Sequence, residues 1–138
     1  MFLSLDGVDG VGKSTQIALL GDWLREQHHQ QVAACRDPGS TPLGEAIRRI
    51  VLEDLSSPIA RTSEMLLYMA ARAQLVQQII QPALRAGKAV LCDRFLLANV
   101  VYQGYAGGLD VDALWAVGEV ATGGLHPANE TGLDAIST

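Results

Sequence analysis

The sequence predicts a mixed α/β domain in which a parallel sheet is covered by helices on both faces. Short apolar segments alternate with longer amphipathic segments along the chain, and turns rich in glycine and proline separate them. Of the 138 residues, 49% are hydrophobic and 18% are charged, which suits one domain with a buried core and excludes a disordered chain. The net charge of −5 argues against a general nucleic-acid-binding protein.

Each strand is predicted from a short apolar run, and each helix from apolar residues that recur every three or four positions. In the first half of the chain, the expected elements are a strand over 2–5, a helix from 14 to about 28, a strand over 31–35, a loop over 37–42 and a helix over 43–55. The second helix should end before Pro58.

The second half of the chain begins with a long predicted helix from Ser63 to Ala86. Ser63 is expected to cap it, and Pro82 to bend it or end its regular part. The remaining expected elements are a strand over 89–92, a helical segment over 96–102 and a helix over 110–122 that Asp110 caps. The order β-α-β-α-α-β-α-α predicts a parallel sheet.

Three features of the sequence predict a cytoplasmic protein. The apolar runs are too short to span a bilayer, and the first residues carry no visible secretory signal. The two cysteines, Cys35 and Cys92, lie far apart in the sequence, which is typical of a reduced compartment. We expect both thiols to be small core groups on neighbouring strands and not a metal site.

Residues 7–14 read Gly-Val-Asp-Gly-Val-Gly-Lys-Ser and fit the phosphate-loop pattern GxxxxGK[ST] in full. A predicted strand precedes them and a predicted helix follows. The glycines let backbone N–H groups surround an anion, and the following helix adds the positive end of its dipole. Lys13 is then expected to reach the β- and γ-phosphates of a nucleotide, and the Ser14 hydroxyl to bind Mg²⁺. GTPases, ATPases, helicases and small-molecule kinases all share this loop.

Further polar residues follow the second and third predicted strands. Arg36 and Arg94 are expected at the carboxyl ends of these strands, where ligands bind in parallel sheets. Asp93 ends an apolar run, as a metal-binding aspartate of the Walker B type does; a surface ion pair between Asp93 and Arg94 is the alternative. Tyr68 and Arg72 are four residues apart and share one helix face. In one interpretation, the ring stacks on a base and the guanidinium hydrogen-bonds its carbonyl. In the other, an exposed arginine lies above a core tyrosine.

Five segments in register resemble the thymidylate kinase family of P-loop nucleoside monophosphate kinases. The segments are Asp6–Gln16, Arg36–Glu45, Ala71–Gln74, Asp93–Phe95 and Val101–Gly104, within a likeness from Phe2 to about Pro127. The resemblance implies a P-loop NTPase-type parallel sheet flanked by helices. It also implies a transferase that moves a phosphoryl group from ATP to dTMP with Mg²⁺, giving dTDP and ADP in dTTP biosynthesis, and a homodimer.

The resemblance also implies roles for individual residues. It makes Lys13, Asp9 and Arg94 catalytic, and Ser14, Asp93 and Asp9 metal-binding. The implied ATP site is Gly7, Val8, Asp9, Gly10, Val11, Gly12, Lys13, Ser14 and Thr15. The implied dTMP site is Arg36, Arg48, Tyr68, Arg72, Arg94, Asn99, Tyr102 and Gln103. In this site Tyr68 would stack on thymine, and Arg72 and Gln103 would read its polar edge.

The sequence departs from the family pattern at several positions. Asp37 and Ser40 stand where the family usually has Glu and Gly, and Phe95 replaces Tyr, changes that are expected to be mild. Ala71 replaces a frequent acidic residue, a change expected to loosen Arg72. After Pro127, the family pattern continues with an apolar strand, a lid and an adenine-binding segment, whereas residues 128–138 contain no apolar run. We therefore expect a kinase-like domain over 1–127 that is incomplete at its C-terminus, and an atypical tail over 128–138 from a truncated or altered end.

The missing segments have consequences for the sheet and for catalysis. The first strand is expected to form an open apolar sheet edge. The phosphate loop has no arginine at Gly10-Val11, so a catalytic arginine would have to come from the absent lid, and impaired activity is expected. The alternatives are a non-catalytic nucleotide-binding fragment or another P-loop nucleoside monophosphate kinase. A GTPase is disfavoured because the sequence has no N-K-x-D motif.

Overall fold

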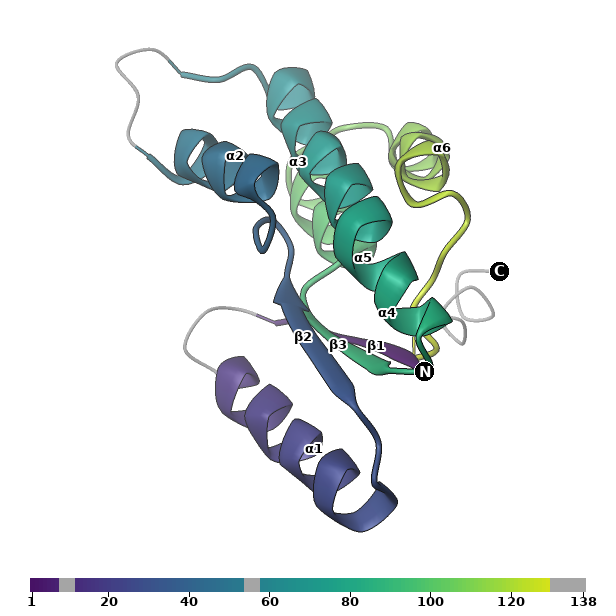
Figure 1. The fold of residues 1–138 in the computed structure, drawn as a ribbon. Helices are drawn as coiled ribbons and strands as arrows, with labels where there is room; N and C mark the ends of the chain where they lie inside the picture. Colours follow the sequence, from purple (N-terminus) through teal and green to yellow (C-terminus); the bar gives the residue numbers. More distant parts are fainter. Residues whose placement is uncertain (8–11, 54–57, 130–138) are drawn as a thin grey trace.

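A three-stranded parallel sheet forms the centre of the protein (Figure 1). The computed structural model describes residues 1–7, 12–53 and 58–129. The strands β1 (Phe2–Leu5), β2 (Val32–Arg36) and β3 (Ala89–Asp93) lie in the order β1-β3-β2. Leu91 of β3 is opposite Leu3 on one side and Ala34 on the other. The predicted parallel sheet is confirmed.

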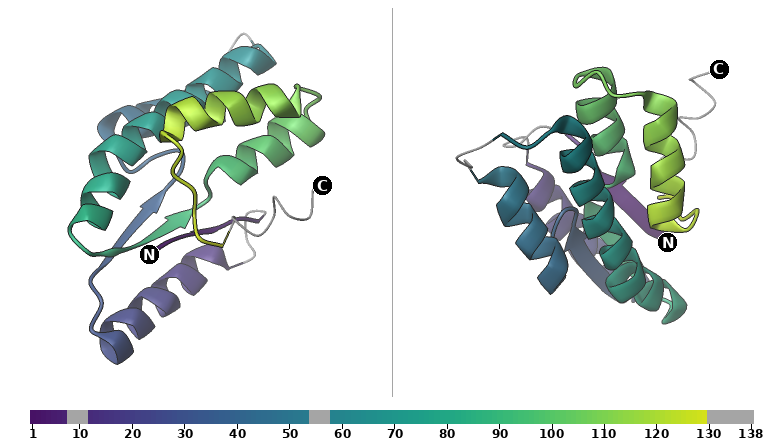
Figure 2. Two further views of the ribbon diagram at one scale, coloured as in Figure 1. Left: turned by 90° about the vertical axis from the view of Figure 1, so that its right-hand side faces the viewer. Right: turned by 90° about the horizontal axis from the view of Figure 1, so that it is seen from above.

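Helices cover both faces of this sheet, as predicted. Helix α1 lies on one face, and the remaining helices lie on the other, in Figure 1 and in the left view of Figure 2. The helical segments are α1 (Lys13–His28), α2 (Pro42–Leu52), α3 (Arg61–Leu75), η1 (Val76–Ile80), α4 (Gln81–Arg85), α5 (Leu96–Asn99), η2 (Val100–Tyr105) and α6 (Val111–Thr122). No helix among the described residues is long and apolar enough to cross a membrane.

Each face of the sheet has its own apolar core. On the α1 face, Leu24 packs with Ala89 and Leu91. The opposite face has the larger core, which includes Phe2, Phe95 and Leu114. Alternate residues of β3 contribute to the two cores, because successive side chains of a strand point to opposite faces.

The long helix predicted from 63 to 86 is divided into three segments. The predicted Ser63 cap is wrong: the helix begins at Arg61, and Ala60 is its N-cap, since nothing after Pro58 prevents the first turn from forming earlier. The segment η1 is π-helical, and the N–H of Gln81 bonds to the carbonyl of Val76. This wider turn accommodates Pro82, which lacks an N–H and crowds the preceding turn of a regular helix. Pro82 therefore ends the regular part of the helix, as predicted.

The other predicted helix ends agree more closely with the structure. Asp110 caps α6 by accepting a hydrogen bond from the N–H of Ala113. Thr41 caps α2 through the N–H of Gly44, with Pro42 in the first turn, where its missing N–H costs nothing. Helix α2 ends at Leu52, earlier than the predicted end at 55, because Glu53 is its C-cap and has an extended backbone. Residues 54 and 55 lie outside the described residues.

The outer edge of β1 is not open, which corrects the expectation from the sequence. The N–H of Ala128 donates to the carbonyl of Phe2 at 2.7 Å. The side-chain amide of Asn129 then pairs with Ser4: its Oδ1 accepts from the Ser4 N–H at 3.2 Å, and its Nδ2 donates to the Ser4 carbonyl at 2.7 Å. Asn129 thus satisfies the same backbone groups that a neighbouring strand would. Residues 130–138 of the predicted tail lie outside the described residues.

The two cysteines are neighbours across the sheet, as predicted. Cys35 of β2 is in register with Cys92 of β3, and both are buried free thiols. A hydrogen bond with Cys35, together with burial, raises the pKa of the Cys92 thiol well above its usual value. Both thiols therefore belong to the core.

Candidate functional site

A cavity of about 350 Å³ opens where β2 and β3 end, between these strand ends, α3 and the α5–η2 segment. It is lined by Asp37, Pro38, Glu64, Tyr68, Arg72, Arg94, Ala98, Asn99, Tyr102 and Gln103. A smaller cavity of about 60 Å³ adjoins it, shares Asp37, Pro38, Tyr68 and Arg94, and adds Arg36, Arg48, Leu52 and Asp93. We call the first the base cavity and the second the phosphate cavity, after the parts of dTMP that the resemblance assigns to their lining residues.

Arg72 is the most deeply buried charged residue that lines the base cavity, with 1% of its surface exposed. Its Nε donates to Asp37, its Nη2 donates to the carbonyl of Phe95 at 3.3 Å, and its Nη1 contacts Met69 Sδ at 3.3 Å. The guanidinium also lies 5.5 Å from the centre of the Phe95 ring. Burial raises the pKa of the Asp37 carboxyl, and the charge of Arg72 opposes that rise.

This arrangement decides two questions that the sequence left open. The alternative of an exposed arginine above a core tyrosine is wrong, because Arg72 is buried and Tyr68 is partly exposed. The expectation that Ala71 loosens Arg72 is also wrong, because Asp37, at the end of β2, holds the guanidinium instead. Arg72 is therefore fixed by groups from α3 and from the segments that follow β2 and β3.

Three of the side chains that line the base cavity form a chain of hydrogen bonds. Asn99 Nδ2 donates to Gln103 Oε1 at 2.8 Å, and Gln103 Nε2 donates to Glu64 Oε1 at 2.9 Å. Asn99 and Gln103 are one helical turn apart and lie on the same face of the α5–η2 segment, whereas Glu64 comes from the first turn of α3. The Oδ1 atom of Asn99 is buried and has no hydrogen-bond partner among the described residues.

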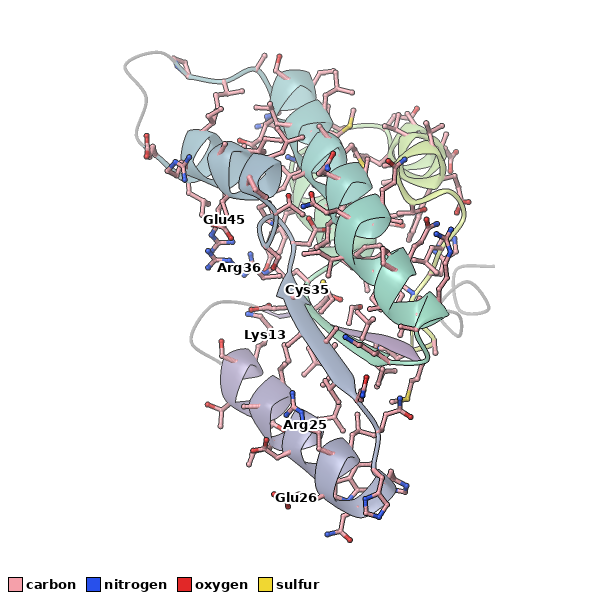
Figure 3. All side chains as sticks on the ribbon, viewed as in Figure 1. Lys13, Arg25, Glu26, Cys35, Arg36 and Glu45 are labelled. Atoms are coloured by element: carbon pink, nitrogen blue, oxygen red, sulfur yellow. The ribbon has the colours of Figure 1, made fainter. Side chains whose placement is uncertain are left out.

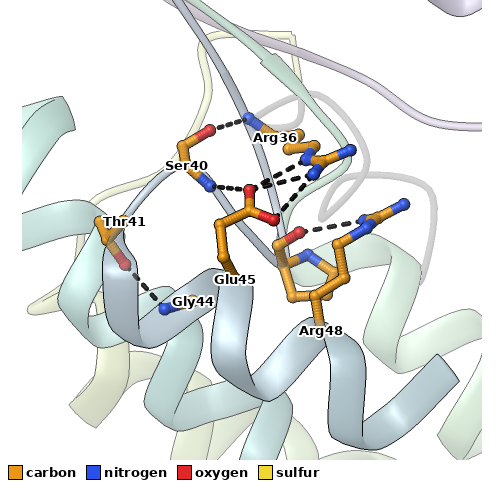
Figure 4. Close-up of polar contacts among 7 residues, drawn as sticks. Arg36, Ser40, Thr41, Gly44, Glu45 and Arg48 are labelled. Carbon is orange, nitrogen blue, oxygen red and sulfur yellow. Dashed lines mark hydrogen bonds and ion pairs between the residues drawn. The ribbon is translucent and has the colours of Figure 1, made fainter. Parts of the chain in front are cut away.

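Three arginines gather at the phosphate cavity, and each is held by a protein acceptor or ring. Arg36 makes a two-pronged ion pair with Glu45, with Nη2 to Oε2 at 2.8 Å, and Arg48 Nη1 donates to the Pro38 carbonyl at 3.0 Å (Figure 4). Arg94 Nη2 donates to the Gly7 carbonyl at 3.3 Å, and its guanidinium lies 5.8 Å from the Tyr102 ring centre.

The loops that present these arginines adopt unusual backbone conformations. Arg94 has φ +66° and Ser40 has φ +66°, a left-handed region that is uncommon for residues other than glycine. Ser40 is held there by two bonds: its hydroxyl accepts from the Arg36 N–H at 2.9 Å, and its own N–H donates to Glu45 at 2.8 Å. Hydrogen bonds to Arg36 and Ser40 lower the pKa of the Glu45 carboxyl.

Lys13 is the first residue of α1 and lies near Asp93, which lines the phosphate cavity. The Lys13 side chain is nearly buried, and its Nζ lies 3.9 Å from Asp93 Oδ1, at the end of β3. Figure 3 shows Lys13 at the first turn of α1, with Arg36 at the end of β2 and Glu45 beyond it. Ser14 and Thr15 follow Lys13 and are exposed. Of the predicted phosphate loop, Gly7 and Gly12 are described, and Val8, Asp9, Gly10 and Val11 lie outside the described residues.

A family model, related sequences and a solved structure all relate this chain to one family. The family model described as thymidylate kinase matches residues 5–129. The chain is 48% identical over 134 residues to the thymidylate kinase of Symbiobacterium thermophilum, and 46% identical over 127 residues to that of Gloeobacter violaceus.

The chain belongs to the thymidylate kinase family.

A crystal structure of thymidylate kinase from Ehrlichia chaffeensis has the same fold, with a TM-score of 0.84 and 34% sequence identity, over 92% of this chain and 71% of that one. The two relatives named above are matched over 97% and 92% of this chain. The chain spans 62% and 59% of their own lengths. The family predicted from the five sequence segments is therefore confirmed.

The structure brings together all eight residues that the thymidylate kinase resemblance assigned to dTMP. Six of them line the base cavity: Tyr68, Arg72, Arg94, Asn99, Tyr102 and Gln103. The other two, Arg36 and Arg48, line the adjoining phosphate cavity. Their roles toward a nucleotide stay predictions.

The sequence analysis assigned no role to two carboxylates that line the base cavity. Glu64 precedes Tyr68 and Arg72 by one and two helical turns, so the same four-residue spacing, extended back by one turn, identifies it. Asp37 directly follows Arg36 at a strand end, but its partner Arg72 is 35 residues away. No local pattern indicates such a pair.

Proposed function

We propose that the base cavity binds the nucleoside of dTMP and that the chain serves phosphoryl transfer from ATP to dTMP. The observation that carries this proposal is the division of the site into two parts. A cavity with buried polar groups adjoins a smaller one that three arginines line, and Lys13 lies beside Asp93, a lining residue of the smaller cavity. A base with a phosphate attached matches this order of polar and cationic groups.

In the proposed complex, the protein positions two polyanions and offsets their charge. Arg36, Arg48 and Arg94 hold the acceptor phosphate, while Lys13 and the N-terminus of α1 hold the donor phosphates. An oxygen of the acceptor phosphate forms a bond to the γ-phosphorus of ATP, the bond from that phosphorus to the β–γ bridging oxygen breaks, and ADP leaves. Fixed cations stabilise the charge that develops during this transfer.

Asp93 and Ser14 fit a Mg²⁺ site beside the donor phosphates. Asp93 Oδ1 is buried and accepts no hydrogen bond from the described residues, and Mg²⁺ prefers oxygen ligands of this kind together with phosphate oxygens. When bound, the ion supplies charge neutralisation and orientation of the phosphates. Asp9, the third residue implied as a ligand, lies outside the described residues.

Tyr68 and Tyr102 border the nucleoside in this proposal. Burial, and then the charge of Glu64, raise the pKa of the Tyr68 phenol, so it stays neutral at physiological pH. Tyr68 and Arg72 occupy successive turns of α3 along one side of the base cavity. A neutral aromatic ring beside a fixed guanidinium suits a planar base that carries carbonyl groups.

Calorimetric titration of the full chain with dTMP, dCMP and dAMP, beside an ADP-coupled turnover assay with ATP and Mg²⁺, tests the proposal. We expect dTMP to bind best among the three nucleotides and to be the preferred acceptor. Stronger binding of dCMP or dAMP would contradict the proposed substrate. Binding of dTMP and ATP without formation of ADP would favour the alternative of a non-catalytic nucleotide-binding protein.

The homodimer implied by the resemblance stays a prediction. Helices α2, α3 and α6 each expose large apolar side chains on the helical layer, among them Ile50, Leu66 and Val120. Such side chains favour association of copies through this layer. Light scattering on the purified chain should give the mass of two copies, and the mass of one copy would contradict the prediction.

A further inference from the structure

We propose that Glu64 fixes the direction in which the Asn99 amide faces the base cavity, and thereby makes the site prefer an imide base over a base with an amidine edge. Thymine and uracil are imides, and cytosine has an amidine edge. The inference rests on the proposed function of the cavity as a nucleotide site. It concerns Glu64 as a positioning residue that acts through Gln103 and Asn99.

The three residues form a continuous chain from the first turn of α3 to the base cavity. Glu64 Oε1 accepts from Gln103 Nε2 at 2.9 Å, and Gln103 Oε1 accepts from Asn99 Nδ2 at 2.8 Å. All three residues line the base cavity. Asn99 and Gln103 are buried, with 4% and 8% of their surfaces exposed, so competition from water for these bonds is small.

The chemistry of a carboxylate gives this chain one direction. An ionised carboxylate only accepts hydrogen bonds, whereas an amide has one accepting end and one donating end. Glu64 therefore requires the NH₂ group of Gln103, which turns the Gln103 oxygen toward Asn99. That oxygen in turn requires the NH₂ group of Asn99.

The remaining group is the Oδ1 atom of Asn99. It is buried, it belongs to a residue that lines the cavity, and it has no hydrogen-bond partner among the described residues. A buried acceptor without a partner is unfavourable, so a ligand that supplies an N–H at this point gains affinity.

Arg72 completes the pattern that a base edge would meet. A guanidinium has five N–H groups and no acceptor, and the contacts of Arg72 with Asp37, Met69 and Phe95 use three of them. The cavity thus offers a donor from Arg72 and an acceptor from Asn99. An imide edge carries a carbonyl oxygen beside an N–H and is complementary to this pair. Cytosine carries an amino group beside an unprotonated ring nitrogen, which is the reverse order.

Replacing Glu64 by glutamine removes the direction while it keeps the shape of the side chain. The introduced amide can donate as well as accept, so the whole chain can reverse and turn the NH₂ group of Asn99 toward the base. We therefore expect Glu64→Gln to weaken discrimination between the two kinds of base. Loss of one matched hydrogen bond corresponds to about a tenfold change in the affinity ratio.

The experiment compares dTMP with 5-methyl-dCMP, which share the methyl group, the sugar and the phosphate and differ only in the polar edge of the base. Calorimetry on the full chain gives both affinities for the wild type, Glu64→Gln and the exchanged variant Glu64→Gln/Gln103→Glu. In the exchanged variant, the carboxylate at position 103 accepts from both neighbours, so Asn99 again presents its oxygen. We expect the preference for dTMP to fall in the single variant and to return in the exchanged one.

A matched control and the possible outcomes keep this test decisive. Glu26→Gln makes the same chemical change on the exposed face of α1, away from both cavities, and should leave the ratio unchanged. A wild type that binds dTMP selectively, together with a single variant of equal selectivity, would overturn the role of Glu64. Failure of the wild type to bind either nucleotide would instead contradict the proposed function. If Glu64→Gln does not fold by circular dichroism, the exchanged variant decides: retained preference supports the proposal, and lost preference overturns it.

Discussion

The base cavity and the phosphate cavity adjoin each other, yet they hold their charged groups in different ways. In the base cavity, Arg72 is buried and its main partner, Asp37, is buried as well. In the phosphate cavity, the Arg36–Glu45 pair is partly open to solvent, with 48% and 36% of the two side chains exposed. A buried pair is costly to break, whereas an exposed pair is worth little and can exchange its partner.

This difference matches the work proposed for each end of the site. A fixed guanidinium and a directed amide suit the recognition of one base edge, which requires a constant geometry. Arginines with exchangeable partners suit a phosphate that enters, gains a phosphoryl group and leaves. The contrast predicts that substitutions in the base cavity mainly affect folding and selectivity, whereas those at the phosphate end mainly affect ligand affinity.

The largest effect is expected from Asp37→Asn. The variant leaves the buried guanidinium of Arg72 without its counter-charge, so the free energy of unfolding should fall by about 3–5 kcal/mol. Urea denaturation measures this change. The control Asp22→Asn, which breaks an exposed pair with Arg25 on α1, should cost less than about 1 kcal/mol. Equal losses in the free energy of unfolding for the two variants would contradict the expected difference between the buried and the exposed ion pair.

A smaller effect, confined to one ligand, is expected from Lys13→Met. The substitution keeps the apolar stem that is nearly buried and removes the charge beside Asp93. ATP affinity should fall by roughly 10- to 100-fold, the worth of one charge-assisted contact, while dTMP affinity stays unchanged. Lys88→Met removes a positive charge near the opposite end of the sheet and serves as the control. A parallel loss of dTMP affinity would contradict the separation of donor and acceptor sites.

The smallest effect is expected from Glu45→Gln. Arg36 and Ser40 lower the pKa of Glu45 in the folded chain, so the pair stabilises the fold above the carboxyl's usual pKa of 4.5. The contribution should then disappear as the pH falls through the lowered value. Urea denaturation at pH 7 should therefore show a loss below about 1 kcal/mol relative to the wild type, and 0.5 M salt should reduce it. A loss that 0.5 M salt leaves unchanged would show that packing, and not charge, explains it.

The sequence predicted the features that depend on local pattern and parallel topology. Short apolar runs located all three strands, and the rule that ligands bind at the carboxyl ends of parallel strands brought Arg36, Asp93 and Arg94 to one edge. The four-residue spacing of Tyr68 and Arg72 placed them on one cavity wall. These inferences hold because they depend on residues close in sequence or on a general property of the sheet.

The sequence did not predict features that depend on distant partners. Asp37 holds Arg72 across two elements, and Asn129 pairs with the backbone of Ser4 from the other end of the described chain. The burial of Arg72 follows from the first contact, and the covered edge of β1 follows from the second. The sequence likewise predicted an interruption at Pro82 but not the π-helical turn that precedes it. Such contacts depend on tertiary packing, which spacing along the chain does not specify.

A crystal structure of the full chain with dTMP tests the central claim most directly. We expect the thymine between Tyr68 and Arg72 on one side and Asn99 on the other, with its N3–H directed at Asn99 Oδ1. We also expect the phosphate beside Arg36, Arg48 and Arg94. A nucleotide bound outside the two cavities, or one bound with its phosphate in the base cavity, would contradict this claim.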